Sequence, residues 1–230
     1  MRTGVDSRDI AVHKIQEFYD ELMFPGHYTS KSIIEYKQTW DNRYINFIES
    51  FIDSNSNVLD VGCGSGLISN VIANSTSCSL TSVDWAQGIK FGEGISKELN
   101  LKNILWQHKD FLKFKTSKKY DVIICQGVLH HIADWKTALE KMKDMLAPNG
   151  VLLLGVYHPI GKLMQKFLKR FFKNKILYTD QILNPYELSW YKSEVINMCA
   201  PLQLANHIPT RYNLDFLFNG GLILYQFRKM

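Results

Sequence analysis

Five short apolar runs, separated by stretches long enough for a helix, limit the fold of this chain more than any other feature of its sequence. They cover residues 57–61, 80–84, 104–108, 121–125 and 150–156. Apolar strands that alternate with helices are typical of a parallel sheet covered by helices on both faces. The sequence therefore predicts an α/β fold. Runs at 204–208 and 222–227 are expected to add an antiparallel pair.

The segments around this alternation are predicted to be helical. Apolar residues at helical spacing predict helices at 10–23 and 32–52, separated by a Phe-Pro-Gly turn. Residues 161–186 do not fit the alternation and are interpreted as an insertion after the fifth strand. A length of 230 residues suits one domain, 1–230. We divide it into amino-terminal helices (10–52), a core (55–160), the insertion (161–186) and a carboxyl-terminal part of the core (187–230).

A glycine-rich turn, Asp-Val-Gly-Cys-Gly-Ser-Gly at residues 60–66, follows the first apolar run. Glycines let a ligand approach the backbone, and the helix that follows presents unpaired N–H groups. A dinucleotide-binding turn requires a glycine five residues after Gly62, where this chain has Leu67. A phosphate-binding P-loop requires Gly-Lys-Ser/Thr, which this turn lacks. A tight turn without a ligand remains the alternative.

Polar residues also follow the second and fourth predicted strands. Asp84 comes 22 residues after Gly62, where a carboxylate can accept both hydroxyls of a ribose; a cap or turn is the alternative. Gln126, His130 and His131 follow the fourth run, and carboxyl ends of parallel strands meet at one crevice. Either histidine could remove a proton from a substrate, or only shape the loop by hydrogen bonding.

These segments together resemble the class I S-adenosylmethionine-dependent methyltransferases. The glycine turn resembles the family's first motif, residues 109–114 its short acidic motif, and 146–150 the turn before its fifth strand, with Asn149 in place of a glycine. Asn tolerates a left-handed conformation, so we expect that turn to persist. The resemblance covers about residues 55–160. It implies a Rossmann-like fold with a seven-stranded, mostly parallel sheet, helices on both faces and a helical lid after strand five.

The resemblance also implies S-adenosyl-L-methionine as the cofactor. The residues that match the family's cofactor positions are Asp60, Gly62, Cys63, Gly64, Gly66, Asp84, Trp85, Asp110, Phe111 and Gln126. Trp85 is expected on the adenine face, with a core position as the alternative. Residues 157–162 and 180–187 resemble a bacterial subgroup without an established substrate. Candidates for the substrate pocket are Tyr19, Tyr28, Tyr157, His158, Asp180 and Gln181.

The net charge of +5 comes from one segment. Six basic residues and no acids lie between Lys162 and Lys175, and without them 21 basic residues face 22 acidic ones. Apolar residues at helical spacing between these charges predict a lid helix with solvated lysines. A membrane surface or an anionic substrate such as RNA is the alternative contact.

We therefore expect a metal-independent methyltransferase acting on O, N or C of a small molecule. The alternatives are an RNA or tRNA methyltransferase that uses residues 162–175, and a non-catalytic cofactor-binding regulator. Nothing after the fourth strand matches Asn/Asp-Pro-Pro-Tyr/Phe, which disfavours adenine methylation. Cys125 is not preceded by proline, which disfavours cytosine C5 chemistry, and no carboxylate cluster follows that strand for a magnesium site.

The apolar runs are too short for a bilayer, and the amino terminus lacks the apolar core of a signal peptide. We expect a cytoplasmic protein without an integral membrane segment. The four cysteines are scattered without a CxxC pair, which favours free thiols over a metal site or disulfides. The sequence does not indicate an oligomeric state.

Overall fold

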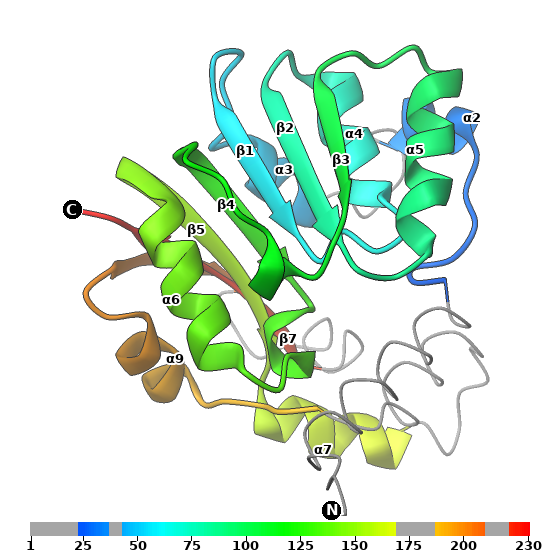
Figure 1. Ribbon diagram of the computed structural model, residues 1–230. Helices are drawn as coiled ribbons and strands as arrows, with labels where there is room; N and C mark the ends of the chain where they lie inside the picture. Colours follow the sequence, from blue (N-terminus) through cyan, green and yellow to red (C-terminus); the bar gives the residue numbers. More distant parts are fainter. Residues whose placement is uncertain (1–22, 37–42, 169–186, 210–220) are drawn as a thin grey trace, which may run out of the picture.

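The computed structural model describes residues 23–36, 43–168, 187–209 and 221–230, with side chains left out at 164–168. Its centre is a seven-stranded sheet in the order β3-β2-β1-β4-β5-β7-β6 (Figure 1). The strands are β1 (Asn57–Val61), β2 (Ser79–Asp84), β3 (Ile104–His108), β4 (Tyr120–Gln126), β5 (Leu146–Tyr157), β6 (Gln203–Ile208) and β7 (Leu222–Arg228). The predicted seven-stranded α/β fold is confirmed.

The register of the central strands places their carboxyl ends at one edge. β1 pairs in parallel with both β2 and β4, so that Asp60 lies beside Ser82 on one side and Ile124 on the other. The strand order reverses between β1 and β4, and ligands of open α/β sheets bind in the crevice at such a reversal. β7 runs antiparallel to β5 and to β6, which confirms the predicted antiparallel pair.

Helices cover both faces of the sheet because successive strand residues point to opposite sides. Leu59 packs into the core on one face and Val58 into the core on the other, and both side chains are fully buried. The first core includes α6 (Trp135–Met145) and α9 (Lys192–Cys199). The second includes α2 (Ser30–Glu35), α3 (Arg43–Glu49), α4 (Leu67–Ser75) and α5 (Gly88–Glu98). Figure 1 shows α6 and α9 on the opposite side of the sheet from α2–α5.

The predicted helix at 32–52 contains two described helices, α2 and α3, and residues 37–42 between them lie outside the described part. The structure also differs from the prediction at both ends, since α2 begins at Ser30 and α3 ends at Glu49. α2 begins earlier because Thr29 and Ser32 form a reciprocal capping box, and its C-cap is Tyr36.

The predicted apolar face of residues 32–52 is kept in part: Ile33 and Ile48, which belong to it, are buried. Its aromatic members in the described residues are half-buried: Tyr36, Tyr44, Phe47 and Phe51. Ile45, which is buried as well, was not predicted on this face. The predicted helix at 10–23 lies outside the described residues, apart from Met23.

Other expectations concern the turn before β5, the insertion and the cysteines. Asn149 adopts φ +62°, as expected for the residue that replaces a glycine. Helix α7 (Pro159–Leu168) begins two residues before the predicted insertion, and residues 169–186 lie outside the described part. All four cysteines are free thiols. No helix in the described part of the chain is long and apolar enough to cross a membrane.

Candidate functional site

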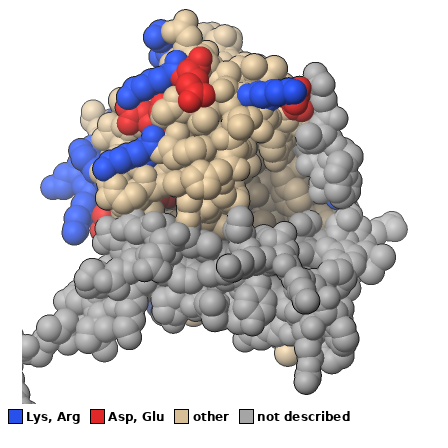
Figure 2. Space-filling view, turned by 90° about the vertical axis from the view of Figure 1, so that its right-hand side faces the viewer, with Lys and Arg blue, Asp and Glu red and all other residues tan. Residues whose placement is uncertain are grey.

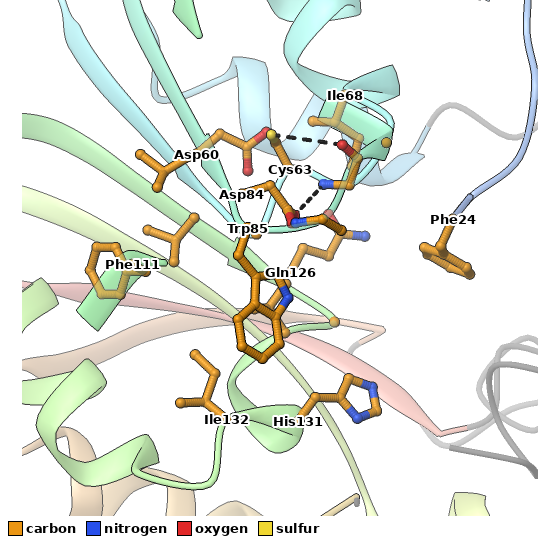
Figure 3. Close-up of a pocket in the computed structure, with 18 of the residues that line it drawn as sticks. Phe24, Asp60, Cys63, Ile68, Asp84, Trp85, Phe111, Gln126, His131 and Ile132 are labelled. Atoms are coloured by element: carbon orange, nitrogen blue, oxygen red, sulfur yellow. Dashed lines mark hydrogen bonds between the residues drawn. The ribbon is translucent and has the colours of Figure 1, made fainter. Parts of the chain in front are cut away.

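A cavity of about 1020 Å³ opens at the carboxyl ends of β1, β2 and β4 (Figure 3). Many of the residues predicted from the sequence line it, although they come from five separate segments. They are Asp60, Gly62, Cys63, Gly64, Asp84, Trp85, Asp110, Phe111, Gln126, His131 and Tyr157. The shared register of the strands brings these segments together.

The glycine turn approaches its neighbours too closely for side chains. Gly62 and Gly64 have φ of +72° and +56°, which glycine adopts without strain. A Cβ on Gly62 would overlap the Val128 side chain, and one on Gly64 would lie 2.5 Å from the Phe24 carbonyl oxygen. Gly66 (φ +79°) begins α4 and packs against Trp106, outside the cavity lining. Gly62 and Gly64 therefore shape the cavity, whereas Gly66 shapes the packing behind it.

Asp84 is held against the glycine turn by two backbone groups. Its Oδ2 accepts a hydrogen bond from Gly64 N at 2.7 Å, and its Oδ1 accepts one from Ala86 N at 2.8 Å (Figure 3). Burial raises the pKa of this carboxyl, while those N–H groups act to lower it. Each carboxylate oxygen has a further lone pair. The carboxylate is thus oriented and can still accept hydrogen bonds from a ligand.

Asp60, at the end of β1, is part of a chain of hydroxyl groups. Its Oδ2 accepts from Ser69 Oγ at 2.5 Å, and Ser69 Oγ accepts from Ser82 Oγ at 2.9 Å. Burial raises the pKa of Asp60 to about 6, against the opposing effect of the Ser69 hydrogen bond. Burial and the nearby Asp84 raise the pKa of the Cys63 thiol well above its usual value. Cys63 therefore lines the cavity as a protonated thiol and is not a thiolate nucleophile.

Asp110 and Trp85 also line the cavity. Asp110 precedes the short 3-10 helix η2 (Phe111–Lys113), and its Oδ1 accepts from Leu112 N at 2.8 Å. Phe111 is nearly fully buried and has a cavity-lining surface. Trp85 lines the cavity, and its indole ring extends toward Ile132 and His131 (Figure 3). The structure therefore favours the ligand-facing position of Trp85 over the core position.

Gln126 is the last residue of β4 and lines the cavity. Its Oε1 is buried and has no hydrogen-bond partner. An unsatisfied buried acceptor costs about 1–3 kcal/mol, and most buried polar atoms have a partner. A bound ligand that donates a hydrogen bond would satisfy this oxygen.

The two histidines of η3 (Leu129–His131) have different surroundings. His131 lines the cavity, whereas His130 is fully buried behind it. The His130 ring lies 4.4 Å from the Tyr157 ring and 4.1 Å from the His131 ring, between centroids. Both His130 nitrogens lack a hydrogen-bond partner, and burial lowers its pKa well below the usual value. His130 is therefore neutral, and His131 is the histidine that a ligand can contact.

An ion pair lies beside these rings. Lys162, in α7, pairs with Glu187, and both side chains are largely buried. Lys162 Nζ also lies 4.2 Å from the centroid of the Tyr157 ring. Donor atoms of His130, His131 and Glu187 come within 4.8 Å of one another, a spacing compatible with a metal site. Because Lys162 neutralises Glu187, this cluster lacks the negative charge that compensates a buried divalent cation, and we assign no metal to it.

Two of the remaining predicted substrate residues, Tyr28 and His158, lie outside the cavity lining. Tyr28 donates to the Ser65 carbonyl at 2.6 Å and accepts from Asn70 Nδ2 at 3.0 Å, which supports the glycine turn from outside. The His158 ring packs against Tyr191, with 5.3 Å between centroids. Tyr19, Asp180 and Gln181 lie outside the described residues.

Sequence reasoning missed several cavity residues, among them Phe24, Pro25, Val128, Ile132, Trp135 and Leu222. The segment at 24–26 crosses the glycine turn: Ser65 N donates to the Phe24 carbonyl at 2.8 Å, and Ser65 Oγ to the Gly26 carbonyl at 3.2 Å. Its Pro-Gly pair indicated a bend but could not show which surface the bent chain covers.

Comparisons with known proteins agree with this site. A family model described as a methyltransferase domain matches residues 52–198, more than half of the chain. The chain is 30% identical over 111 residues to ubiquinone biosynthesis O-methyltransferase of Glaesserella parasuis, covering 46% of this chain and 47% of that one. It is 25% identical over 168 residues to (S)-coclaurine N-methyltransferase of Papaver somniferum, covering 67% and 46%. It thus spans about half the length of these relatives.

A solved structure shows the same fold. The N-methyltransferase NodS from Bradyrhizobium japonicum, in complex with S-adenosyl-L-homocysteine, matches with a TM-score of 0.64 at 18% identity, covering 94% of this chain and 98% of that one. The family match, together with this fold, shows that the chain belongs to the methyltransferase domain family, among the class I S-adenosylmethionine-dependent methyltransferases.

Proposed function

We propose that this protein transfers a methyl group from S-adenosyl-L-methionine to an O, N or C atom of a small-molecule acceptor. One observation carries the proposal: all the residues matched to the cofactor except Gly66 line the same cavity as His131 and Tyr157. Its volume of about 1020 Å³ lies at the upper end of the range for small-molecule sites, about 300–1,000 Å³. That volume favours a cofactor and an acceptor held side by side.

The groups present fit such a cofactor. Asp84, oriented by two backbone N–H groups, would accept the ribose hydroxyls, and Asp110 would accept the adenine amino group. The turn at Gly62–Gly64 leaves room for the methionine part, and the unpartnered Oε1 of Gln126 would accept from its ammonium. When bound, the cofactor supplies a methyl group on a positively charged sulfur, which is already activated for transfer.

The chain itself then supplies alignment and a proton acceptor. Rigid placement of two reactants can account for a large share of a rate enhancement. His131 is the cavity histidine, so we assign to it the proton that an acceptor hydroxyl or amine loses. His130 is buried behind it, and we assign it the support of the His131 ring and not proton transfer.

The apolar side chains in the cavity lining favour an acceptor with an apolar body. They include Ile132, Trp135 and Leu222, and Leu222 pairs with Tyr157 across β5 and β7. The names of the two enzyme relatives also refer to small-molecule methylation. The RNA alternative has less support, because Lys162 of the basic segment is paired with Glu187 and is not available for a phosphate.

Calorimetric titration with S-adenosyl-L-homocysteine, with NAD as the control ligand, tests the donor site. We expect micromolar binding of the first ligand only. Asp84→Asn keeps the size of the side chain and should weaken binding at least tenfold, because a charged acceptor is lost. Asp144→Asn, on an exposed aspartate, should bind like the parent. Absence of binding in protein freed of carried-over ligand would refute the proposal.

Transfer of a labelled methyl group from the cofactor to the small-molecule fraction of a cell extract tests whether the acceptor is a small molecule. His131→Gln should lower kcat about a hundredfold or more while leaving the affinity for S-adenosyl-L-homocysteine unchanged. His158→Gln, which alters a histidine outside the cavity lining, is the matched control. Cofactor binding with no transfer to any extract component would favour the non-catalytic regulator.

A further inference from the structure

The adenine end of the proposed cofactor site is a very short turn. η2 has three residues. Its internal hydrogen bonds run from Lys113 N and Phe114 N to the Asp110 carbonyl, each at 3.0 Å, and from Phe114 N to the Phe111 carbonyl at 3.2 Å. The Asp110 side chain adds a bond from Leu112 N. Short 3-10 segments have poor hydrogen-bond geometry and little stability of their own. The conformation of this turn therefore depends on contacts with another element.

Lys141 supplies that contact from the opposite side of the turn. It lies in α6, and its Nζ donates to the Phe111 carbonyl at 2.6 Å and to the Leu112 carbonyl at 2.9 Å. The same Nζ lies 5.0 Å from the centroid of the Phe111 ring. A cation at the carboxyl end of a helical turn satisfies carbonyl groups that the turn leaves exposed, and it is favoured by the local dipole.

Burial and the charged groups near Lys141 affect the pKa of its ammonium group. Partial burial lowers the pKa of Lys141, Asp110 acts to raise it, and Lys115 acts to lower it. Lys141 does not line the cavity, whereas Asp110, Phe111 and Leu112 all do. Its influence on a ligand must therefore pass through the turn. No motif identifies it, since 30 residues separate it from Phe111.

We propose that Lys141 is a positioning residue for adenine selectivity: by holding two carbonyls of η2, it keeps the Asp110 carboxylate facing the amino group of the purine. This inference rests on the proposed function, in which Asp110 accepts that group. Lys141→Met keeps most of the side-chain length but leaves both carbonyls without the ammonium. The turn should then relax, and Asp110 should no longer be held toward the base.

Selectivity is measured with two ligands that differ only at the purine. One is S-adenosyl-L-homocysteine, and the other is S-inosyl-L-homocysteine, in which an oxygen replaces the amino group. The parent protein should prefer the first, because the inosine oxygen would face the Asp110 carboxylate. The measured ratio is the dissociation constant of the inosyl ligand divided by that of the adenosyl ligand. In Lys141→Met we expect this ratio to fall about tenfold, the scale of one hydrogen bond to a charged group.

Two variants make the result specific. Lys141→Arg should restore the ratio, because a guanidinium offers several donors to neighbouring carbonyls. Lys143→Met is the matched control, since Lys143 lies in the same helix, does not line the cavity, and donates to two backbone carbonyls outside η2, those of Met198 and Ala200. Circular dichroism and the melting temperature establish folding. If Lys141→Met does not fold, Lys141→Gln, which keeps one donor, should give an intermediate ratio.

The outcomes separate this inference from the proposed function. An unchanged ratio in a folded Lys141→Met protein overturns the inference alone. This includes the case in which both ligands bind more weakly by the same factor, because Lys141 would then only support the fold. A parent protein that binds neither ligand refutes the proposed function and this inference together.

Discussion

Two carboxylates near the ends of β1 and β2, the buried Asp60 and the half-buried Asp84, receive different hydrogen bonds. Asp84 accepts from two backbone N–H groups, whereas Asp60 accepts from the Ser69 hydroxyl. Burial raises the pKa of both groups, to about 6 for Asp60. At neutral pH, Asp60 therefore carries a buried charge that the folded state disfavours relative to the unfolded chain.

This charge makes the stability of the protein depend on pH. Because the folded-state pKa is raised, the folded protein holds a proton that the unfolded chain releases, and stability falls as pH rises from about 4 through about 6. Asp60→Asn removes this titration and can keep the Ser69 hydrogen bond. The difference in unfolding free energy, Asn variant minus parent, should therefore increase by about 2 kcal/mol between pH 4 and pH 7.5.

Urea denaturation at both pH values without cofactor measures this increase. Only the change of this difference with pH is diagnostic. Any loss of unfolding free energy caused by burying the asparagine amide is the same at both pH values. Asp144→Asn, on an exposed residue, should show no comparable change. A difference for Asp60→Asn that stays constant with pH would contradict the raised pKa.

At the scale of elements, α5 packs unusually closely against the glycine turn. A Cβ on Gly92 would lie 2.6 Å from the Ser65 carbonyl oxygen, 2.8 Å from the Trp106 ring and 3.1 Å from Gly66 Cα. A Cβ on Gly94, two residues later in the same helix, would have no neighbouring atom within 4 Å. The two glycines differ only in what the tertiary structure places beside them.

We therefore expect alanine to have opposite effects at these positions. Gly92→Ala should lower the unfolding free energy by about 1–3 kcal/mol and weaken cofactor binding, since α5 must move away from the turn. Gly94→Ala should raise the unfolding free energy by about 0.5–1 kcal/mol through helix propensity alone. Chemical denaturation of both variants measures the effects. Equal changes at the two sites would show that the close packing is not rigid.

The predicted strands agree with the structure to within four residues at each end, because a run buried on both faces is visible in the sequence. Helix ends were harder to predict. The boundary of α2 depends on a Thr29–Ser32 capping box, and η2 depends on Lys141, a residue 30 positions away. Periodicity records which residues are buried, but not where a hydrogen-bonded cap ends a helix.

For the whole molecule, the net charge of +5 does not mean that basic side chains are unpaired, because several of them lie beside acidic ones. Figure 2 shows acidic side chains beside basic ones on one face. Exposed ion pairs lie on the surfaces of α5 and α2, for example Lys97–Glu93 and Lys31–Glu35. Lys162, the first residue of the basic segment, is buried against Glu187. In the described part of the chain these pairs reduce the positive potential available to a polyanion.

RNA binding should accordingly be weak. We expect a dissociation constant above about 1 μM for unmodified tRNA at physiological salt, in the range of non-specific binding. Fluorescence anisotropy over a salt series measures both affinity and salt dependence. If the five remaining basic residues at 166–175 all contacted phosphates, log K would fall with log salt with a slope of about −3.5. A slope that steep, with tight binding, would favour the RNA alternative.

The sequence by itself determined the α/β fold and the strand positions from local features: buried runs, turn residues and their order along the chain. The acids and glycines of the proposed cofactor site followed from the resemblance of these segments to the methyltransferase family. The tertiary structure decided which residues meet. It turned His131 toward the cavity and buried His130, joined Asp60 to Ser69, and placed Lys141 under the Asp110 turn. Such contacts depend on packing between distant segments, which no local pattern records.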